Sequence, residues 1–191
     1  QLGRDVLSRL VYGIRATVFL SLLTMAITSA LGACVGLVSG FFRNRIDDVL
    51  MRICDVMMSF PSEVMILAIV GMTGPGLENV VIANVVAKWP WYARMVRSIV
   101  RQYSDKDYIR FAKVAGGSSI RIMMRHLLPG TAGELFVLTT LDTGSVILMI
   151  SALSFLGLGV QPPTPEWGMM LNEAKEVMTL YPLQMIPAGM A

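Results

Sequence analysis

The sequence has few charged residues and few of the side chains that carry enzyme chemistry. Asp, Glu, Lys and Arg make up only 15% of the 191 residues, against about a quarter in soluble proteins, while 54% are hydrophobic. The phosphate-binding pattern G-x-x-x-x-G-K-[ST] does not occur in the sequence. No catalytic residue set is predicted, and the composition favours the lipid bilayer as the solvent.

Residues that bind transition metals are equally scarce. A pathway for naked metal ions would need several His, Cys or carboxylate ligands that converge, but the chain has one histidine, His126, and two cysteines. Cys34 and Cys54 lie in apolar stretches, where free thiols pack as small core residues. The fifteen methionines are interpreted as adaptable apolar filler. No metal site is predicted.

Long apolar stretches predict membrane-spanning helices. Ala16–Phe42 is a run of 27 residues without a charge, and a spanning helix needs about 20. The predicted spans cover residues 12–40, 49–72, 77–92 and 132–158, an amphipathic segment covers 167–178, and a further span begins near Leu183. We therefore expect an all-α, polytopic membrane protein with about five spans represented in this chain.

Glycine and proline give these spans local features. Gly32, Gly36 and Gly40 lie on one face of the first span at the G-x-x-x-G spacing, which lets helices approach closely in lipid. The turn-forming residues 73–76 are expected to end the second span, and Pro90 is expected to interrupt the third.

The basic residues predict the orientation of the chain. Eight of the sixteen Lys and Arg residues fall between Arg94 and Arg125, and Lys and Arg accumulate on the cytoplasmic side of membranes. The loops at about 41–52 and 94–130 are therefore expected to be cytoplasmic in a prokaryotic cell (inner) membrane. Three arginines fall on the opposite side and are not explained by the charge rule: Arg4, Arg9 and Arg15.

The basic segment 94–130 is predicted to contain two short helices. Tyr108–Gly116 is expected to form the first, and Ser118–Leu128 the second, which Pro129 and Gly130 should stop. An apolar face on this pair is expected from Phe111, Ala112, Ala115 and Ile120. Such a pair suits a groove on a soluble partner, but the positive-inside rule or contact with anionic lipid also accounts for the charge. Nucleic acid is not an expected partner, because both ends of the segment run into spans.

The segment Phe111-Ala112-Lys113-Val114-Ala115-Gly116, with Leu128-Pro129 twelve residues after Gly116, resembles the EAA loop of binding-protein-dependent ABC importer permeases. In that family the loop forms the coupling helices that seat in a cleft of the ATPase. The resemblance implies that role for Arg110, Phe111, Ala112, Lys113, Gly116, Gly117, Leu128 and Pro129. Arg110 and Phe111 replace the signature Glu and the first Ala, which leaves the individual contacts of Arg110 open.

Three further stretches, residues 1–10, 89–97 and 153–168, resemble the dipeptide, oligopeptide and nickel permeases. The resemblance implies a type I ABC importer transmembrane domain over 12–191, preceded by an external segment at 1–11, with the first of six spans and most of the sixth outside this chain. It also implies a second homologous permease, two ATP-binding subunits that hold ATP and Mg, an external solute-binding protein and surrounding membrane lipid. No cofactor is expected on this chain itself.

Two short stretches and two acidic residues indicate the solute and its pathway. Residues 139–144 and 181–185 look closer to nickel permeases, so nickel as a chelate, or else a small peptide, is the expected solute. Glu134 and Asp142 are the intramembrane acids expected to serve the pathway, although Asp142 pairing with a neighbouring helix is an equal alternative. An ion-coupled secondary transporter and a membrane scaffold or sensor are the rival functions, and neither gives the basic loop a role.

Overall fold

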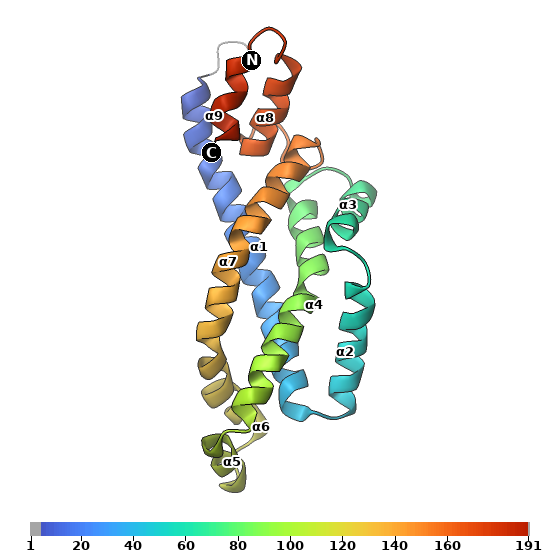
Figure 1. Ribbon diagram of the computed structural model, residues 1–191, viewed down its shortest axis with the longest axis vertical. Helices are drawn as coiled ribbons and strands as arrows, with labels where there is room; N and C mark the ends of the chain where they lie inside the picture. Colours follow the sequence, from blue (N-terminus) through green and yellow to red (C-terminus); the bar gives the residue numbers. More distant parts are fainter. Residues whose placement is uncertain (1–4, 191) are drawn as a thin grey trace. The chain divides into compact units, whose positions relative to one another are not determined.

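The computed structural model describes residues 5–190, which form helices joined by turns (Figure 1). The helices are α1 (Val6–Phe42), α2 (Arg45–Met58), α3 (Ser62–Thr73), α4 (Leu77–Ser104), α5 (Asp107–Val114), α6 (Ser119–Ile122), the π-helix η1 (Met123–Leu127), α7 (Leu128–Phe155), α8 (Trp167–Glu176), the 3-10 helix η2 (Pro182–Gln184) and α9 (Met185–Gly189). No strand occurs within residues 5–190, so the predicted all-α class is confirmed. The predicted external segment at 1–11 begins outside the described residues, and its later part already belongs to α1.

The chain divides into two compact units, which are described separately. The first unit contains the residues up to Met25, Glu63–Val85 and the residues from Asp142 onward. The second unit contains Ala26–Ser62 and Val86–Leu141.

Two helices within residues 5–190 are long and apolar enough to cross a membrane. They are α1 and the continuous helical stretch Ser119–Phe155, each of 37 residues. The helices α2 and α3 meet at an angle of 79°. Together they form a third candidate span if the pair is one broken span. The prediction of one unbroken second span over 49–72 is therefore wrong. The break falls before Pro61, which lacks an N–H group and disfavours the helical conformation at Phe60.

Helix α4 is longer than the sequence predicted. It continues for 28 residues through Pro90 to Ser104, so the interruption expected at Pro90 is wrong. A proline inside a helix costs about 3 kcal/mol, because a backbone hydrogen bond is lost. Packing offsets this cost, since Tyr92, Val96 and Val100 immediately beyond it are fully buried.

The glycine face of α1 packs against α4 in the second unit, as the G-x-x-x-G spacing predicted. A Cβ atom placed on Gly32 would lie 2.3 Å from Cβ of Tyr92, and one on Gly36 would lie 2.6 Å from the Ala93 carbonyl oxygen. Gly40 is similarly close, at 2.8 Å from a methyl group of Val100. No side chain fits at these three positions without separating the helices.

Helix α8 is fastened to α1 and α7 within the first unit. The fully buried Glu166 caps α8, and its carboxylate also accepts hydrogen bonds from Ser151 Oγ at 2.8 Å and Thr17 Oγ1 at 3.3 Å. Arg9 forms an ion pair of 2.6 Å with Glu173. Arg9 is one of the arginines that the charge rule left unexplained, and its charge is compensated locally.

Candidate functional site

Two short helices connect α4 to α7 in the second unit (Figure 1). We call residues 105–127 the α4–α7 loop. Its side chains Ile109, Ile122 and Leu127 are 0–2% exposed and pack in one hydrophobic cluster with Val96 and Val100 of α4. The loop is therefore built onto the core of the unit, because burying three aliphatic side chains of this size contributes about 1.5–3 kcal/mol each.

A glycine turn separates the two helices. Gly116 has a φ of +79°, and its N–H donates to the Lys113 carbonyl at 3.1 Å while Gly117 N–H donates to the Ala112 carbonyl at 3.0 Å. This pair of hydrogen bonds is the Schellman motif, in which the first residue after the helix takes the left-handed conformation that glycine adopts most easily. The turn predicted at Gly116 is present.

The second helix starts as predicted but does not stop as predicted. The Ser118 hydroxyl accepts a hydrogen bond from Arg121 N at 3.4 Å and caps α6. The helical path then continues through η1 into α7, so the expected stop at Pro129 and Gly130 is wrong. Pro129 lies inside this continuous helical stretch, just after the π-helix, and the helix passes its missing N–H without ending.

The outer side of the loop exposes large apolar side chains. Phe111, Val114 and Ile120 are 74%, 88% and 71% exposed, and we call these three the loop patch. Of the predicted apolar face, Phe111, Ala115 and Ile120 are exposed, but Ala112 packs against the core cluster instead. Val114 was not predicted for this face, although it lies three residues after Phe111 and hence on the same side of α5.

The remaining loop residues singled out from the sequence have different surroundings. Arg110 is exposed, whereas the Lys113 ammonium lies over the Phe41 ring, 4.7 Å from its centroid. A Cβ atom on Gly117 would lie 2.8 Å from the Ala112 carbonyl oxygen, so that position has no room for a side chain. Leu128 packs against the core cluster. Lys113, Gly117 and Leu128 thus hold the loop to the unit, and the loop patch lies on its outer side.

The arginine directly after α1, Arg43, holds the start of the α4–α7 loop in place. Arg43 Nη1 donates to Asp105 at 3.0 Å, and its Nη2 donates to the Arg101 carbonyl at 2.6 Å. The hydrogen bond from Arg43 lowers the pKa of the Asp105 carboxyl below its ordinary value. Asp105 is therefore ionised at neutral pH and holds the first residue of the α4–α7 loop against α1.

A buried acid between α2 and α4 was not identified from the sequence. The Asp47 side chain is 4% exposed and accepts hydrogen bonds from Arg97 at 2.5 and 2.7 Å, as well as from Arg101 and Ser39. The signal was present in the sequence, because Arg97 and Arg101 are four residues apart and so lie on one face of a helix. This network fixes the part of α4 that leads into the loop.

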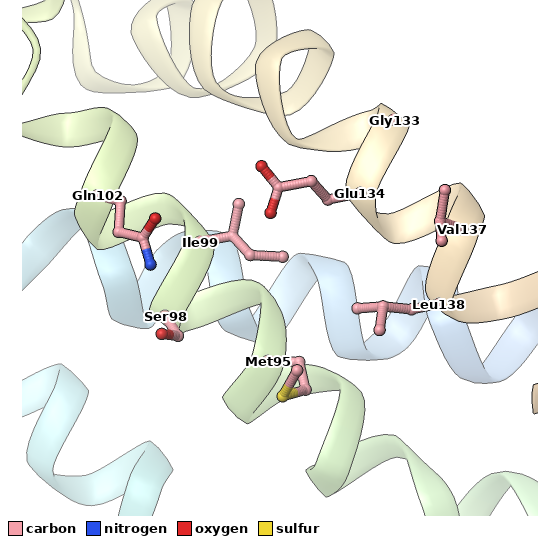
Figure 2. A pocket seen from close by; sticks show the side chains of 8 residues that line it. All are labelled: Met95, Ser98, Ile99, Gln102, Gly133, Glu134, Val137 and Leu138. Carbon is pink, nitrogen blue, oxygen red and sulfur yellow. The ribbon is translucent and has the colours of Figure 1, made fainter. Parts of the chain in front are cut away.

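Glu134, one of the two predicted pathway acids, lines a pocket in the second unit. The pocket has a volume of about 470 Å³ and lies between α4 and α7 (Figure 2). Its lining residues are Met95, Ser98, Ile99, Gln102, Gly133, Glu134, Val137 and Leu138. The Glu134 carboxylate accepts a hydrogen bond from Tyr103 Oη at 3.1 Å, so the pocket borders the residue at the end of α4 from which the loop departs.

Asp142 is the other predicted pathway acid, and it does not line this pocket. It lies two helical turns beyond Glu134 on α7, belongs to the first unit and is half-buried. Within residues 5–190, no group of three or more His, Cys, Asp or Glu side chains is placed to hold a metal ion. His126 is half-buried in η1.

Comparison with known proteins places the chain in a family. Residues 32–190 match the family described as binding-protein-dependent transport system inner membrane component. Over 190 residues the whole chain is 42% identical to the metal-staphylopine import system permease protein CntC of Staphylococcus aureus and covers 66% of it. It is 38% identical over 190 residues to the nickel transport system permease protein NikC of Escherichia coli and covers 69% of it.

A third relative has a different solute in its name. The chain is 43% identical over 176 residues to the di/tripeptide transport system permease protein DppC of Pseudomonas aeruginosa, which is 92% of this chain and 58% of that protein. The chain thus spans 58–69% of the length of these relatives. The matched region includes the α4–α7 loop, the loop patch and the pocket at Glu134. The chain belongs to the family of binding-protein-dependent transport system inner membrane components.

Proposed function

We propose that the chain is the membrane-spanning permease subunit of an ATP-driven importer, and that its α4–α7 loop docks on a separate ATPase subunit. The observation that carries this proposal is the loop patch. Phe111, Val114 and Ile120 expose large apolar side chains on a hairpin whose other side is built into the core. Large apolar side chains exposed on firmly held short helices are typical of an element that inserts into a groove on a partner.

The same proposal fixes the assembly and the orientation. Two ATP-binding subunits hold ATP and Mg and hydrolyse the nucleotide, a second homologous permease completes the membrane channel, and an external binding protein delivers the solute. The α4–α7 loop and the α1–α2 junction then face the cytoplasm, where positively charged loops accumulate. Arg43 and Asp105 join these two segments, which supports placing them on one side of the membrane.

The solute that we propose is nickel carried as a chelate, or else a small peptide. The names of the relatives include a nickel system, a metal-staphylopine system and a di/tripeptide system. A chelated metal and a small peptide are both compact polar solutes, so the permease needs no metal-binding cluster of its own. Uptake assays with nickel chelates and dipeptides, each with the cognate binding protein, distinguish the two.

Docking through the loop patch is tested by co-purification with the ATPase subunit. We expect Phe111→Ala to weaken the association at least tenfold, because buried aromatic anchors typically contribute 2 kcal/mol or more to an interface. Phe136→Ala is the matched control, since Phe136 is also a phenylalanine and is 70% exposed, but on α7. Equal association of the two variants with the ATPase would contradict docking through this surface.

The main rival function is ion-coupled secondary transport, and the energy source separates the two. In proteoliposomes that contain the assembled complex, uptake should require ATP and should persist when ionophores collapse the ion gradients. Uptake that stops with the ionophore and continues without ATP would establish the rival function instead.

A further inference from the structure

The pocket between α4 and α7 contains one ionisable group and several polar neighbours. Glu134 projects from α7 toward Ile99 and Gln102 of α4 (Figure 2). Ser98 and Gln102 supply a hydroxyl and an amide on the opposite wall. The remaining lining is apolar or glycine, as in small-molecule sites, where a few polar groups orient a ligand against an apolar wall.

The carboxylate in this pocket has no compensating positive charge. Within residues 5–190, its one hydrogen-bond partner is the Tyr103 hydroxyl, and no arginine or lysine forms an ion pair with it. Glu134 is exposed, whereas Asp47 and Asp55 of the second unit each pair with an arginine of α4. No arginine, lysine or histidine lines the pocket.

We infer that this pocket is a binding site for a cationic group of the transported solute, such as a protonated amine or the positively charged end of a metal chelate. The carboxylate of Glu134 supplies the charge, and the Gln102 amide and the Ser98 hydroxyl supply further oxygen acceptors. A volume of about 470 Å³ lies within the range of small-molecule sites, which is roughly 300–1,000 Å³. The inference rests on the proposed function, because it names the chemistry of the solute on that pathway.

Tyr103 is a positioning residue for this site. Its hydroxyl donates to Glu134 Oε1 at 3.1 Å, and its ring packs against the core cluster that anchors the α4–α7 loop. One side of the tyrosine therefore orients the carboxylate, while the other follows the loop. We expect the orientation of the carboxylate, and with it the affinity of the pocket for a cation, to depend on this hydroxyl.

Charge-selective labelling of a cysteine in the pocket tests the inference without relying on transport. Ser98→Cys is introduced into the full-length permease, with Cys34→Ala and Cys54→Ala, and the complex is assembled with its partner subunits. The rates of modification by a cationic and an anionic methanethiosulfonate of similar size are then compared. The charged group of the reagent then lies on the order of 8 Å from the unpaired carboxylate. At this separation in water, the cationic reagent should label the cysteine about five times faster than the anionic one.

Two matched pairs of variants assign the effect. Glu134→Gln should bring the ratio of the two rates close to one, whereas Glu78→Gln, which changes an acid outside the pocket, should leave it unchanged. A bound cationic solute should slow the labelling of the cysteine, and Tyr103→Phe should reduce this protection. Tyr108→Phe should not reduce it, since the hydrogen bond to Glu134 comes from Tyr103. The same ratio in the Glu134→Gln variant and its parent would overturn the inference.

Protection of the cysteine from labelling by added solutes shows whether the pocket binds the transported solute. Lysyl-alanine and the 1:1 complex of nickel(II) with histidine, each with one net positive charge, are the cationic probes, and aspartyl-alanine is the anionic probe. Slower labelling with either cationic probe, and not with the anionic one, supports the inference, and no protection by either cationic probe overturns it. A cation preference that is present in the permease purified alone but lost in the assembled complex also overturns it, because a basic side chain of a partner then occupies the pocket.

This experiment separates the inference from the proposed function. If the assembled complex shows no ATP-dependent uptake of any solute, the proposed function fails, whatever the labelling shows. If uptake is ATP-dependent but Glu134→Gln changes neither the labelling ratio nor the relative uptake of lysyl-alanine and aspartyl-alanine, only the cation site fails.

Discussion

The turn at Gly116 offers the sharpest test of the α4–α7 loop, because its replacement by alanine strains the backbone without creating a clash. A Cβ atom at Gly116 would have no neighbour within 4 Å, so Gly116→Ala creates no clash. The φ of +79° is nevertheless a left-handed conformation, which costs an L-residue roughly 1–2 kcal/mol. That cost acts on the turn between α5 and α6 and therefore on the position of the loop patch.

The expected effect on docking follows from this cost. If the ATPase binds the loop only when its turn has the native conformation, a penalty of about 1–2 kcal/mol weakens binding by up to roughly 5- to 30-fold. The assay is the dissociation constant between the permease in detergent and its ATPase subunit, together with ATP-driven uptake in proteoliposomes. At a saturating concentration of the ATPase subunit, the Gly116→Ala variant should recover part of its uptake rate, because mass action restores the bound state.

Gly74→Ala is the matched control. Gly74 has a φ of +89° and likewise no neighbour within 4 Å of a Cβ atom, but it follows α3, outside the loop. Its replacement carries a similar backbone cost and should leave ATPase binding unchanged. If the two variants bind the ATPase equally well, the turn at Gly116 does not position a docking surface and the reasoning is refuted.

Two further predictions concern the scaffold beneath the loop, and thermal unfolding of the purified protein checks both. Gly36→Ala should destabilise the protein by about 1–3 kcal/mol, because its Cβ would lie 2.6 Å from a carbonyl oxygen of α4. Gly71→Ala is the control and should be tolerated, because a Cβ there has no neighbour within 4 Å. Equal unfolding temperatures of the two variants would contradict the close packing at Gly36. Asp47→Asn should cost about 3 kcal/mol, the lower end of the range for a broken buried ion pair, since its arginine partners are partly exposed. Asp55→Asn should cost less than about 1 kcal/mol because that ion pair is exposed, and a larger loss there than at position 47 would be inconsistent with the observed burial.

The sequence predicted those parts of the fold that depend on local composition. The uncharged run from Ala16 to Phe42 lies wholly within α1, and the glycine spacing on that helix identified its close contact with α4. The prediction failed at prolines, because the effect of a proline depends on tertiary contacts that are not visible in a local pattern. Pro90 is accommodated by the packing of the residues after it, Pro61 lies in the break between α2 and α3, and Pro129 lies just after the π-helix inside a continuous helical stretch.

The candidate site was predicted in part for the same reason. The turn at Gly116 and the cap at Ser118 follow from local chemistry, and both are present. The spacing of Arg97 and Arg101 marked one side of the buried network, but its acid, Asp47, lies fifty positions before Arg97, so a local pattern does not identify the pair. The pocket at Glu134 likewise requires knowing that α7 lies against α4, although the acid itself stood out in an apolar stretch.

The contacts in the second unit indicate which element is able to change position when a partner docks on the loop. Helix α4 is held to α1 at Gly36, where no Cβ fits, so these two helices resist separation. Helix α7 packs on the core cluster of the unit through Leu128 and Leu135, and it is joined to the loop through the π-helix Met123–Leu127, a geometry that often marks functional sites. A displacement of the loop is therefore expected to reach α7 through this π-helix. The hydrogen bond between Tyr103 and Glu134 joins α4 to α7, so a shift between the two helices would change its distance.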